Sequence, residues 1–349
     1  MNLILDLDYT VLLILSSLII AVLLGWISIR LAPEIGLMDI PGSAGHKAHS
    51  NPIPLTGGVV LIDAILFMSL ITGLWKDTEI LAIVISGLII ASFGLIDDFM
   101  DLSPIKKLIG QISGSIVLIY LGVQIQIFDS PEFFYRTDSE LAYWLNISFT
   151  ILWLITITNA FNFIDSIDGL ATGLSGMSIA FFLFISILSG QVQMIYFCSI
   201  LLGICIGIYF FNAHPAKLFL GDSGAQTFGF LLASIAIVFD PNTGNQSSTW
   251  FVPILFFSVP LFDLTLVIIS RFRRKKNIYM ASRDHTFHRL EKMGISIQHA
   301  VLTMHGVSLI MSMVGYLCLN LPSVFANIVF LQTLLLAIFM IIKLDNNYS

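Results

Sequence analysis

The chain has 349 residues, of which 57% are hydrophobic and only 11% are charged. An average soluble domain carries about 25% charged residues, so this composition excludes an ordinary soluble protein and predicts a membrane protein with many spans. The formal charge of −6 decides little, because the position of each charge matters more in a membrane protein than the sum. Cys198, Cys205 and Cys318 lie in apolar runs, which is typical of small buried side chains rather than of disulfides or metal thiolates.

Apolar runs that approach the length of a membrane span recur along the whole chain. A spanning helix needs about 20 mostly apolar residues. The candidate spans are Tyr9–Ile29, Leu55–Leu74, Ile80–Ile96, Ile105–Ile127, Trp144–Phe161, Leu170–Leu188, Met194–Phe211, Ala225–Phe239, Trp250–Ser270, Ala300–Leu319 and Ser323–Ile342. Asp6 and Asp8 precede the first run in place of a basic stretch, so we expect a retained helix there rather than a cleaved signal peptide. Because no connection is long enough for a soluble domain, residues 1–349 are predicted to form one all-α, polytopic membrane domain with about ten or eleven spans.

The basic residues predict which face is cytoplasmic. If all these runs cross the membrane, 14 of the 16 Lys and Arg residues fall on one side, and only Lys76 and Arg136 fall on the other. Cytoplasmic loops carry the excess of Lys and Arg, so the first side is predicted to be cytoplasmic. Five polar clusters also fall on this side, which predicts one composite site at the cytoplasmic surface. They are Lys47–His49, Asp97–Asp101, Asn159–Asp168, Asn212–Asp222 and Arg283–Arg289.

The central cluster is the segment NAFNFIDSIDGLA, residues 159–171. It places the amides of Asn159 and Asn162 and the carboxylates of Asp165 and Asp168 between two apolar runs. An Asp at the centre of a membrane helix costs roughly 2.5–3.5 kcal/mol on insertion scales. A bound cation or a polar substrate is therefore expected to compensate this segment.

Two further acidic motifs indicate a metal and phosphate. In DDFMD, Asp97 and Asp101 share a helical face and Asp98 lies about 100° away. Three acids in one turn repel one another unless a cation shares the site, and oxygen donors of this kind suit Mg²⁺ together with substrate phosphates. In FLGDSGA, Asp222 stands between two glycines at the expected start of a helix, where it either caps the helix or brings metal and phosphate together. A solvated helix end remains the alternative for the first motif.

The last cytoplasmic loop carries a histidine motif, SRDHTFHRL. His285 and His288 stand at i and i+3 with Arg289 beside them, which suits phosphate better than zinc because no third soft ligand is near. A pair of interfacial histidines is the alternative. The run RFRRKK, at 271–276, predicts an anchor to anionic lipid, and Lys47 in the first loop is within reach of a phosphate.

The order DDFMD, NAFNFIDSIDGLA, FNAHPAKLFLGDSGA and SRDHTFHRL resembles the polyprenyl-phosphate N-acetylhexosamine-1-phosphate transferases. That family includes the translocase of peptidoglycan synthesis and the WecA-type enzymes that start O-antigen and related glycans. The resemblance covers nearly the whole chain, from MDIP at Met38 to the last cytoplasmic loop. It implies an enzyme of the bacterial cytoplasmic membrane, with a cytoplasmic active site and a membrane-embedded groove for the lipid.

The resemblance also implies residue roles. It assigns catalysis to five side chains near the lipid phosphate, the metal or the diphosphate: Asp97, Asp98, Asp165, His285 and His288. It assigns substrate binding to five others, with Asn212 and Phe219 at the uridine and Asp168 near the nucleotide: Lys47, Asp168, Asn212, Phe219 and Arg289. It assigns Mg²⁺, or alternatively Mn²⁺, to Asn162, Asp222 and Asp98.

Two departures from the family pattern stand out. Ser166 follows the first central Asp where the family usually has Gly, and Thr286 and Phe287 separate two histidines where the family often has three close together. The second departure favours the WecA-like branch over the peptidoglycan translocase.

The predicted reaction transfers N-acetylhexosamine-1-phosphate from a UDP-N-acetylhexosamine, by default UDP-GlcNAc, to undecaprenyl phosphate. The products are undecaprenyl-diphosphate-HexNAc and UMP, the former starting an O-antigen or another envelope glycan. The predicted partners are these two substrates, with a homodimer as the assembly considered and with no nucleic acid. The alternatives are the phospho-N-acetylmuramoyl-pentapeptide transferase and, in another class, an ion-coupled transporter. A transporter would carry its ionisable residues near the midplane, and Asp63 is interpreted as the one carboxylate left inside a span.

Overall fold

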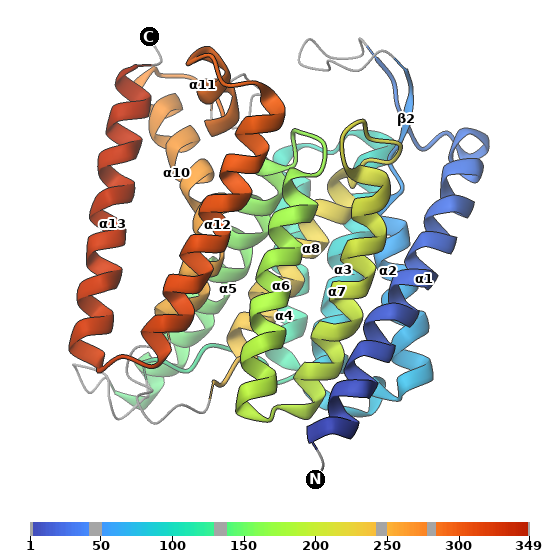
Figure 1. Ribbon diagram of the computed structural model, residues 1–349, viewed down its shortest axis with the longest axis horizontal. Helices are drawn as coiled ribbons and strands as arrows, with labels where there is room; N and C mark the ends of the chain where they lie inside the picture. The colour runs from blue at the N-terminus through green and yellow to red at the C-terminus, as the bar shows by residue number, and fades with distance from the viewer. Residues whose placement is uncertain (1–2, 42–50, 129–137, 242–249, 278–283, 348–349) are drawn as a thin grey trace.

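The computed structural model is a bundle of helices packed side by side (Figure 1) and describes residues 3–41, 51–128, 138–241, 250–277 and 284–347. Two short strands, β1 (Met38–Asp39) and β2 (Ile53–Pro54), pair antiparallel beside the bundle. The helices are α1 Leu3–Ile35, α2 Gly57–Thr72, η1 Leu74–Lys76, α3 Thr78–Met100, α4 Pro104–Tyr120, α5 Ser139–Ile164, α6 Leu170–Ser189, α7 Val192–Asn212, α8 Gly221–Val238, α9 Val252–Phe256, α10 Ser258–Arg273, α11 Thr286–Lys292, α12 Ile297–Leu319 and α13 Ser323–Asn346.

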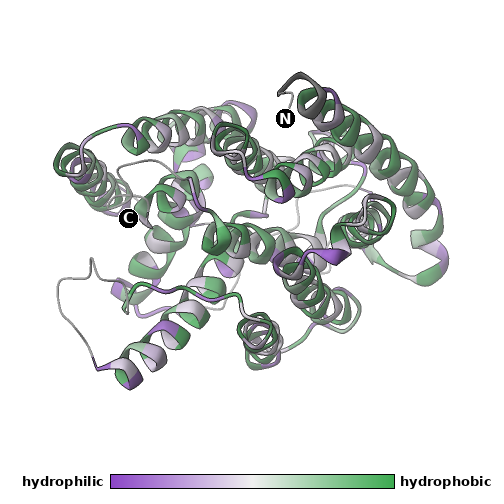
Figure 2. Ribbon diagram, turned by 90° about the horizontal axis from the view of Figure 1, so that it is seen from below, coloured by the Kyte–Doolittle hydropathy of each residue, from purple (hydrophilic) through white to green (hydrophobic). Residues whose placement is uncertain are grey.

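Every predicted span contains a helix, and the run Trp250–Ser270 is divided between α9 and α10. Within the described residues, seven helices are long and apolar enough to cross a membrane: α1, α3, α5, α6, α7, α12 and α13. The other predicted spans correspond to helices that are shorter, such as α2 with 16 residues, or that begin with polar residues, such as α8. The all-α, polytopic membrane fold is therefore confirmed. When the bundle is viewed end-on, most helical residues have the colour of hydrophobic residues (Figure 2).

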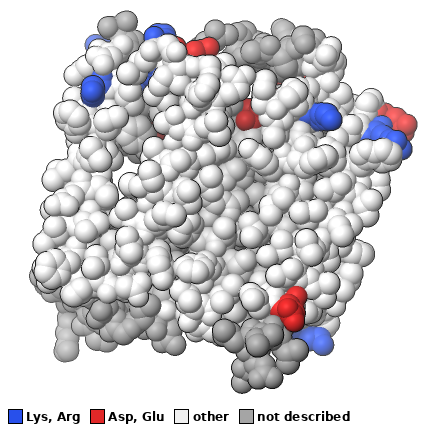
Figure 3. All heavy atoms as spheres, viewed as in Figure 1, with Lys and Arg blue, Asp and Glu red and all other residues white. Residues whose placement is uncertain are grey.

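Helix α1 begins and α13 ends at opposite ends of the bundle (Figure 1), which fits eleven spans rather than ten. We call the end at which α3 finishes and α2 and α8 begin the site edge; it is the upper edge in Figure 1 and also carries α11. On the face shown in Figure 3, Lys and Arg gather mostly along this edge, and the broad belt below it is uncharged. The belt has the surface that a bilayer requires.

Helix α8 is the centre of the bundle. Every residue from Ser223 to Ile235 is buried, and the helix packs against α2, α3 and α5. The approach depends on glycine at two positions, because a Cβ on Gly58 would lie 2.2 Å from Ser223 Oγ and one on Gly94 would lie 2.5 Å from Ser223 Cα. The start of α8 is therefore held against α2 and α3.

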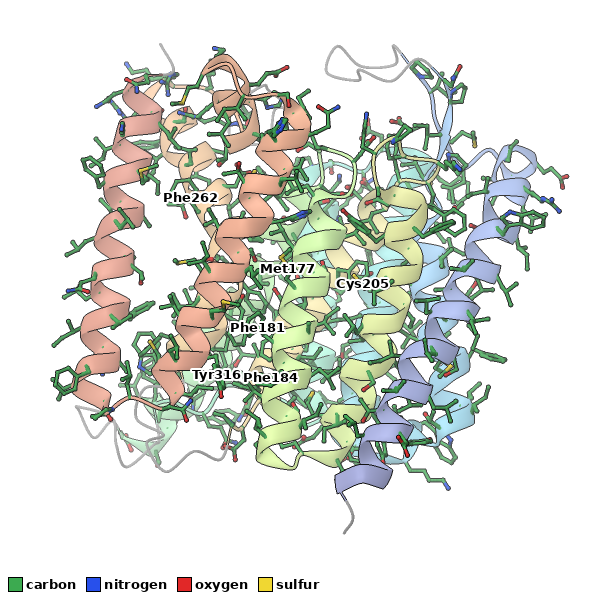
Figure 4. The ribbon with its side chains drawn as sticks, viewed as in Figure 1. Met177, Phe181, Phe184, Cys205, Phe262 and Tyr316 are labelled. Carbon is green, nitrogen blue, oxygen red and sulfur yellow. The ribbon has the colours of Figure 1, made fainter. Side chains whose placement is uncertain are left out.

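An apolar cavity of about 280 Å³ lies between α6 and α12. Phe181, Phe184 and Tyr316 line it (Figure 4), together with Ala180 and Met313. The lining contains no acid, base or amide, so this cavity is separate in chemistry from the polar clusters at the site edge.

Candidate active site

The acids of two distant motifs meet around one lysine. Lys107, in the first turn of α4, places its Nζ 2.6 Å from Asp97 Oδ2 at the end of α3. The same ammonium bonds Asp222 in the first turn of α8. The chain reverses between α3 and α4 at Asp101, which has a left-handed φ of 51°, and this reversal returns Lys107 to the acids. Both carboxylates therefore share one positive charge.

Asp98 stabilises the start of α8. Its Oδ1 accepts from the Asp222 N–H at 2.7 Å, and its Oδ2 accepts from the Ser223 N–H at 3.1 Å and the Ser223 hydroxyl at 2.6 Å. A carboxylate at a helix N-terminus satisfies unpaired N–H groups and interacts favourably with the helix dipole. Gly221 permits the contact, since its φ is +69° and a Cβ there would lie 2.6 Å from the Asp98 carboxylate.

The central motif brings its own acids to the same place. Asn162, in the last turn of α5, lies close enough to the Asp222 side chain to stabilise its charged form and to lower its pKa. Asp165 ends α5, and its pKa is raised well above the usual range by withdrawal from water and then by repulsion from Asp222, Asp98 and Asp168. This crowding of acids around Lys107 is an excess of negative charge that favours a further cation.

Ser166 is exposed and its hydroxyl donates to the Phe163 carbonyl at 3.1 Å. Its backbone does not adopt a positive φ, so the position accommodates a side chain without strain. Gly169, by contrast, has a φ of +73° and starts α6, which is the backbone turn that only glycine adopts readily.

Asp168 and Asn212 organise the loop before α8. Asp168 Oδ2 accepts from the Ala216 N–H at 3.1 Å and hydrogen-bonds His214 Nδ1 at 2.9 Å. The buried amide of Asn212 accepts from the Gly169 N–H and the Thr172 hydroxyl and donates to the Leu218 carbonyl. Asn212 therefore holds the loop through a buried bond to Leu218, and Asp168 holds it through His214 and Ala216.

Phe219, the candidate stacking residue, is held through its backbone. Its N–H donates to the Pro54 carbonyl at 2.8 Å, and its carbonyl accepts from the Gly57 N–H at 3.0 Å. These bonds attach the segment before α8 to β2 and the start of α2. Lys47, the predicted basic residue of the first loop, lies outside the described residues, as does Arg283.

The histidine motif is anchored to α10. His285 Nδ1 lies 2.8 Å from Asp263 Oδ2, and the Thr286 N–H donates to Asp263 Oδ1 at 2.6 Å. Asp263 is fully buried. The His285 ring centroid lies 6.5 Å from that of Phe163 in the central motif and 6.0 Å from that of His288. The fold thus brings the histidine motif beside the central motif.

Arg289, which follows His288 in the histidine motif, is buried. Its side chain is 2% exposed, its Nε donates to the Asp284 carbonyl at 2.9 Å, and its Nη1 donates to the Leu344 carbonyl at 2.9 Å. Burial lowers its pKa, which Asp345 opposes. Arg271 binds the Asp284 carboxylate through two parallel hydrogen bonds of 2.9 and 3.0 Å. Both arginines therefore make contacts within the protein.

Sequence reasoning overlooked three of these residues as site members. Lys107 and Asp284 stand beside recognised motifs, but nothing local indicates their partners. Asp263 could have been found, because an acid inside an apolar span is itself a signal. The interpretation of Asp63 as the one carboxylate inside a span is wrong, since Asp263 lies within Trp250–Ser270 and within α10.

Comparison with known proteins identifies the family of the chain. Residues 80–240 match the model of glycosyl transferase family 4. The chain is 30% identical to the Bacillus subtilis protein named "Probable undecaprenyl-phosphate N-acetylglucosaminyl 1-phosphate transferase", over 87% of this chain and 85% of that protein. It is 28% identical to the Mycobacterium tuberculosis decaprenyl-phosphate N-acetylglucosaminephosphotransferase, over 79% and 74%. It is 33% identical to the Enterococcus faecalis phospho-N-acetylmuramoyl-pentapeptide-transferase, over 56% and 64%. The chain therefore belongs to glycosyl transferase family 4, the polyprenyl-phosphate sugar-phosphate transferases.

Proposed function

We propose that this multi-pass membrane transferase moves N-acetylhexosamine-1-phosphate, by default GlcNAc-1-phosphate, from its UDP carrier to undecaprenyl phosphate. The observation that carries the proposal is the meeting of DDFMD, the central motif, FLGDSGA and the histidine motif at one end of an apolar bundle. A lipid phosphate anchored in the bilayer and a water-soluble nucleotide sugar can meet only at such an edge. We place this edge on the cytoplasmic side of the bacterial inner membrane, because most Lys and Arg lie there.

The residues fit a divalent cation. Within the described part of the chain, no three His, Cys, Asp or Glu side chains converge as a ready metal group, yet Asp97 and Asp222 already share a cation, the Lys107 ammonium. Mg²⁺ usually takes one or two carboxylates together with substrate phosphates. Asp222, Asp97 and Asn162 would hold it, with Mn²⁺ as the alternative. Asp98 is a weaker ligand candidate, since its oxygens accept three hydrogen bonds from α8.

In the reaction, an oxygen of undecaprenyl phosphate attacks the sugar-linked phosphorus, the bond from that phosphorus to the UMP oxygen breaks, and UMP leaves. The bound metal would neutralise the charge of the phosphates. The acceptor is already largely ionised near neutral pH, because its second pKa is about 6, so no side chain has to remove a proton from it. Catalysis then depends on positioning and on electrostatic stabilisation.

The chain's own residues divide these tasks. Asp263 holds His285 through Nδ1, which leaves the other ring nitrogen to donate to a phosphate oxygen when the ring is protonated. His288 lies beside it. Asp168 orients the loop that carries Phe219, and the Phe219 ring offers a stacking face for uracil. Asn212 acts by shaping that loop, since its amide is already bonded on both sides.

The test is an assay of the full-length protein with radiolabelled UDP-GlcNAc, undecaprenyl phosphate and Mg²⁺, following UMP release. We expect UMP and a labelled lipid to appear together, and a chelator to stop both. A panel of UDP-HexNAc donors includes UDP-N-acetylmuramoyl-pentapeptide, because the chain also matches the pentapeptide transferases. UMP release from that donor alone would reassign the protein to peptidoglycan synthesis. No UMP release from any donor would refute the transferase proposal.

A further inference from the structure

The last helix, α13, has few contacts within the membrane part of the protein. Only 11% of the most apolar stretch of this helix is buried. The helix packs on α10 and α12 at the outside of the bundle (Figures 1 and 4). Apolar packing therefore contributes little to the position of this helix.

The last turn of α13 differs, because it buries a carboxylate among arginines. Asp345 is 1% exposed. Its Oδ2 accepts from Arg273 at 2.5 Å and its Oδ1 from Arg274 at 2.5 Å, while its backbone carbonyl accepts from Arg274 at 2.9 Å. The third arginine is Arg289, 3.4 Å from Oδ1. We call Asp345 and these three arginines the C-terminal clamp.

The clamp joins α10, which contacts the histidine motif through Asp263, to α11, which carries part of that motif. Arg273 and Arg274 end α10, which also carries Asp263, the partner of His285. Arg289 lies in α11 and donates to the carbonyl of Asp284, the residue before His285. Asp345 therefore bridges the helix that orients His285 and the helix that begins directly after it.

We infer that Asp345 is a positioning residue for the histidine motif, and that α13 serves the active site through its last turn. This inference rests on the proposed function for its effect on turnover. A buried ion pair contributes little net stability compared with apolar packing of the same volume, so stability alone is a weak reason for burying one acid among three arginines. Removing the carboxylate would leave the arginines to repel one another and would remove one of the links between α10 and α11, so that only the bonds of Asp263 and Arg271 would position the histidine motif on α10.

The experiment compares three variants of the full-length protein in lipid nanodiscs. Asp345→Ala removes the clamp, Asp345→Glu retains its charge, and Asn346→Ala is the matched control. Asn346 is the next residue and also accepts from Arg273, at 3.2 Å, but at an exposed position. The readouts are kcat and KM for the UDP-sugar and the rate at which diethyl pyrocarbonate modifies His285. The modification of His285 is obtained by subtracting the signal of the same variant that also carries His285→Ala.

We expect Asp345→Ala to lower kcat by about tenfold to a hundredfold, since a displacement of about 1 Å is enough for such a loss. KM should stay within about twofold. His285 is only 7% exposed, so its modification should become faster. Asp345→Glu should recover most of kcat, and Asn346→Ala should resemble the wild type.

Unchanged kcat and unchanged modification in folded Asp345→Ala would overturn the inference. So would a lower melting temperature with both of these readouts unchanged, because the clamp would then be structural only. The modification arm needs no turnover. A wild type that releases no UMP would therefore refute the proposed reaction and leave the positioning of His285 open to measurement.

Discussion

At the scale of single residues, the charge balance of the site depends on Lys107. Its ammonium is shared by Asp97 and Asp222, and the carboxylates of Asp98 and Asp165 lie nearby. Lys107 thus occupies the position that suits a metal ion between the two acids. A lysine and a divalent cation compete for the same oxygen atoms. Either one can therefore neutralise the two carboxylates when the other is absent.

We expect Lys107→Met to destabilise the metal-free protein by on the order of 2 kcal/mol, a value reduced from that of a buried pair because the side chain is 28% exposed. Mg²⁺ should restore much of this loss, since a ligand that binds only the folded state stabilises it. The measurement is thermal melting in chelator and in Mg²⁺. Lys106→Met, one residue earlier and exposed, is the control. An equal Mg²⁺ increment in Lys107→Met and in the wild type would contradict a shared site.

The role of Lys107 could not be predicted from its neighbours in sequence. The acids of DDFMD indicate that a cation is needed, and two lysines follow within ten residues. Which of them turns toward the acids depends on the reversal at Asp101 and on α8, more than a hundred residues later in the chain.

At the scale of elements, the start of α8 is the most constrained point of the bundle. Two other helices approach it without space for a further side chain: α2 at Gly58, and the last turns of α3 at Gly94 and Asp98. Asp222 projects from this point. Backbone packing therefore fixes the position from which the Asp222 side chain extends.

Gly221→Ala tests this constraint, with Gly190→Ala as a matched control. Both glycines have a left-handed backbone, φ +69° and +72°, but a Cβ on Gly190 would meet nothing within 4 Å, whereas one on Gly221 would meet Asp98. Gly190→Ala should cost only the left-handed strain of roughly 1–2 kcal/mol. Gly221→Ala should cost clearly more and should also remove transferase activity. Equal melting temperatures for the two variants would mean that the Asp98 contact does not constrain the turn.

Local pattern accounts for the helices but not for this junction. The glycines around Asp222 predict a sharp turn into a helix, and Asp98 is predicted to lie near a metal. That Asp98 also binds the first N–H groups of α8 follows from how α3 packs on α8, and no spacing between two motifs separated by 124 residues reveals it.

At the scale of the whole molecule, the apolar runs and the distribution of Lys and Arg predict the architecture well. Hydropathy is a local property, so each span is visible in the chain, and α1 begins and α13 ends at opposite ends of the bundle, which fits eleven spans rather than ten. The partner of a buried group is a non-local property. Asp263 and His285, or Arg289 and Asp345, become neighbours only when the bundle assembles.

Single cysteines test the orientation of the bundle. Cys198, Cys205 and Cys318 are buried, so the background labelling of the wild type should be low. In intact cells, a membrane-impermeant maleimide should label Lys76→Cys, at the edge opposite the site, and should leave Ser103→Cys, at the site edge, unlabelled until the membrane is permeabilised. Both positions are exposed. The reverse pattern would place the site outside the cytoplasm.

The hydrogen bonds of Asp98 have a consequence for how the doublet Asp97–Asp98 is understood. Two identical neighbours differ in the helix that each one serves. Asp98 accepts three hydrogen bonds from the start of α8, whereas Asp97 accepts from the Leu102 N–H on one oxygen and contacts the Lys107 ammonium on the other. Asp98 therefore holds α8 in place, and Asp97 contacts the charged group inside the site. The two adjacent aspartates of the motif thus have different structural roles. Helix α8, which lies outside the motif, determines which aspartate has which role.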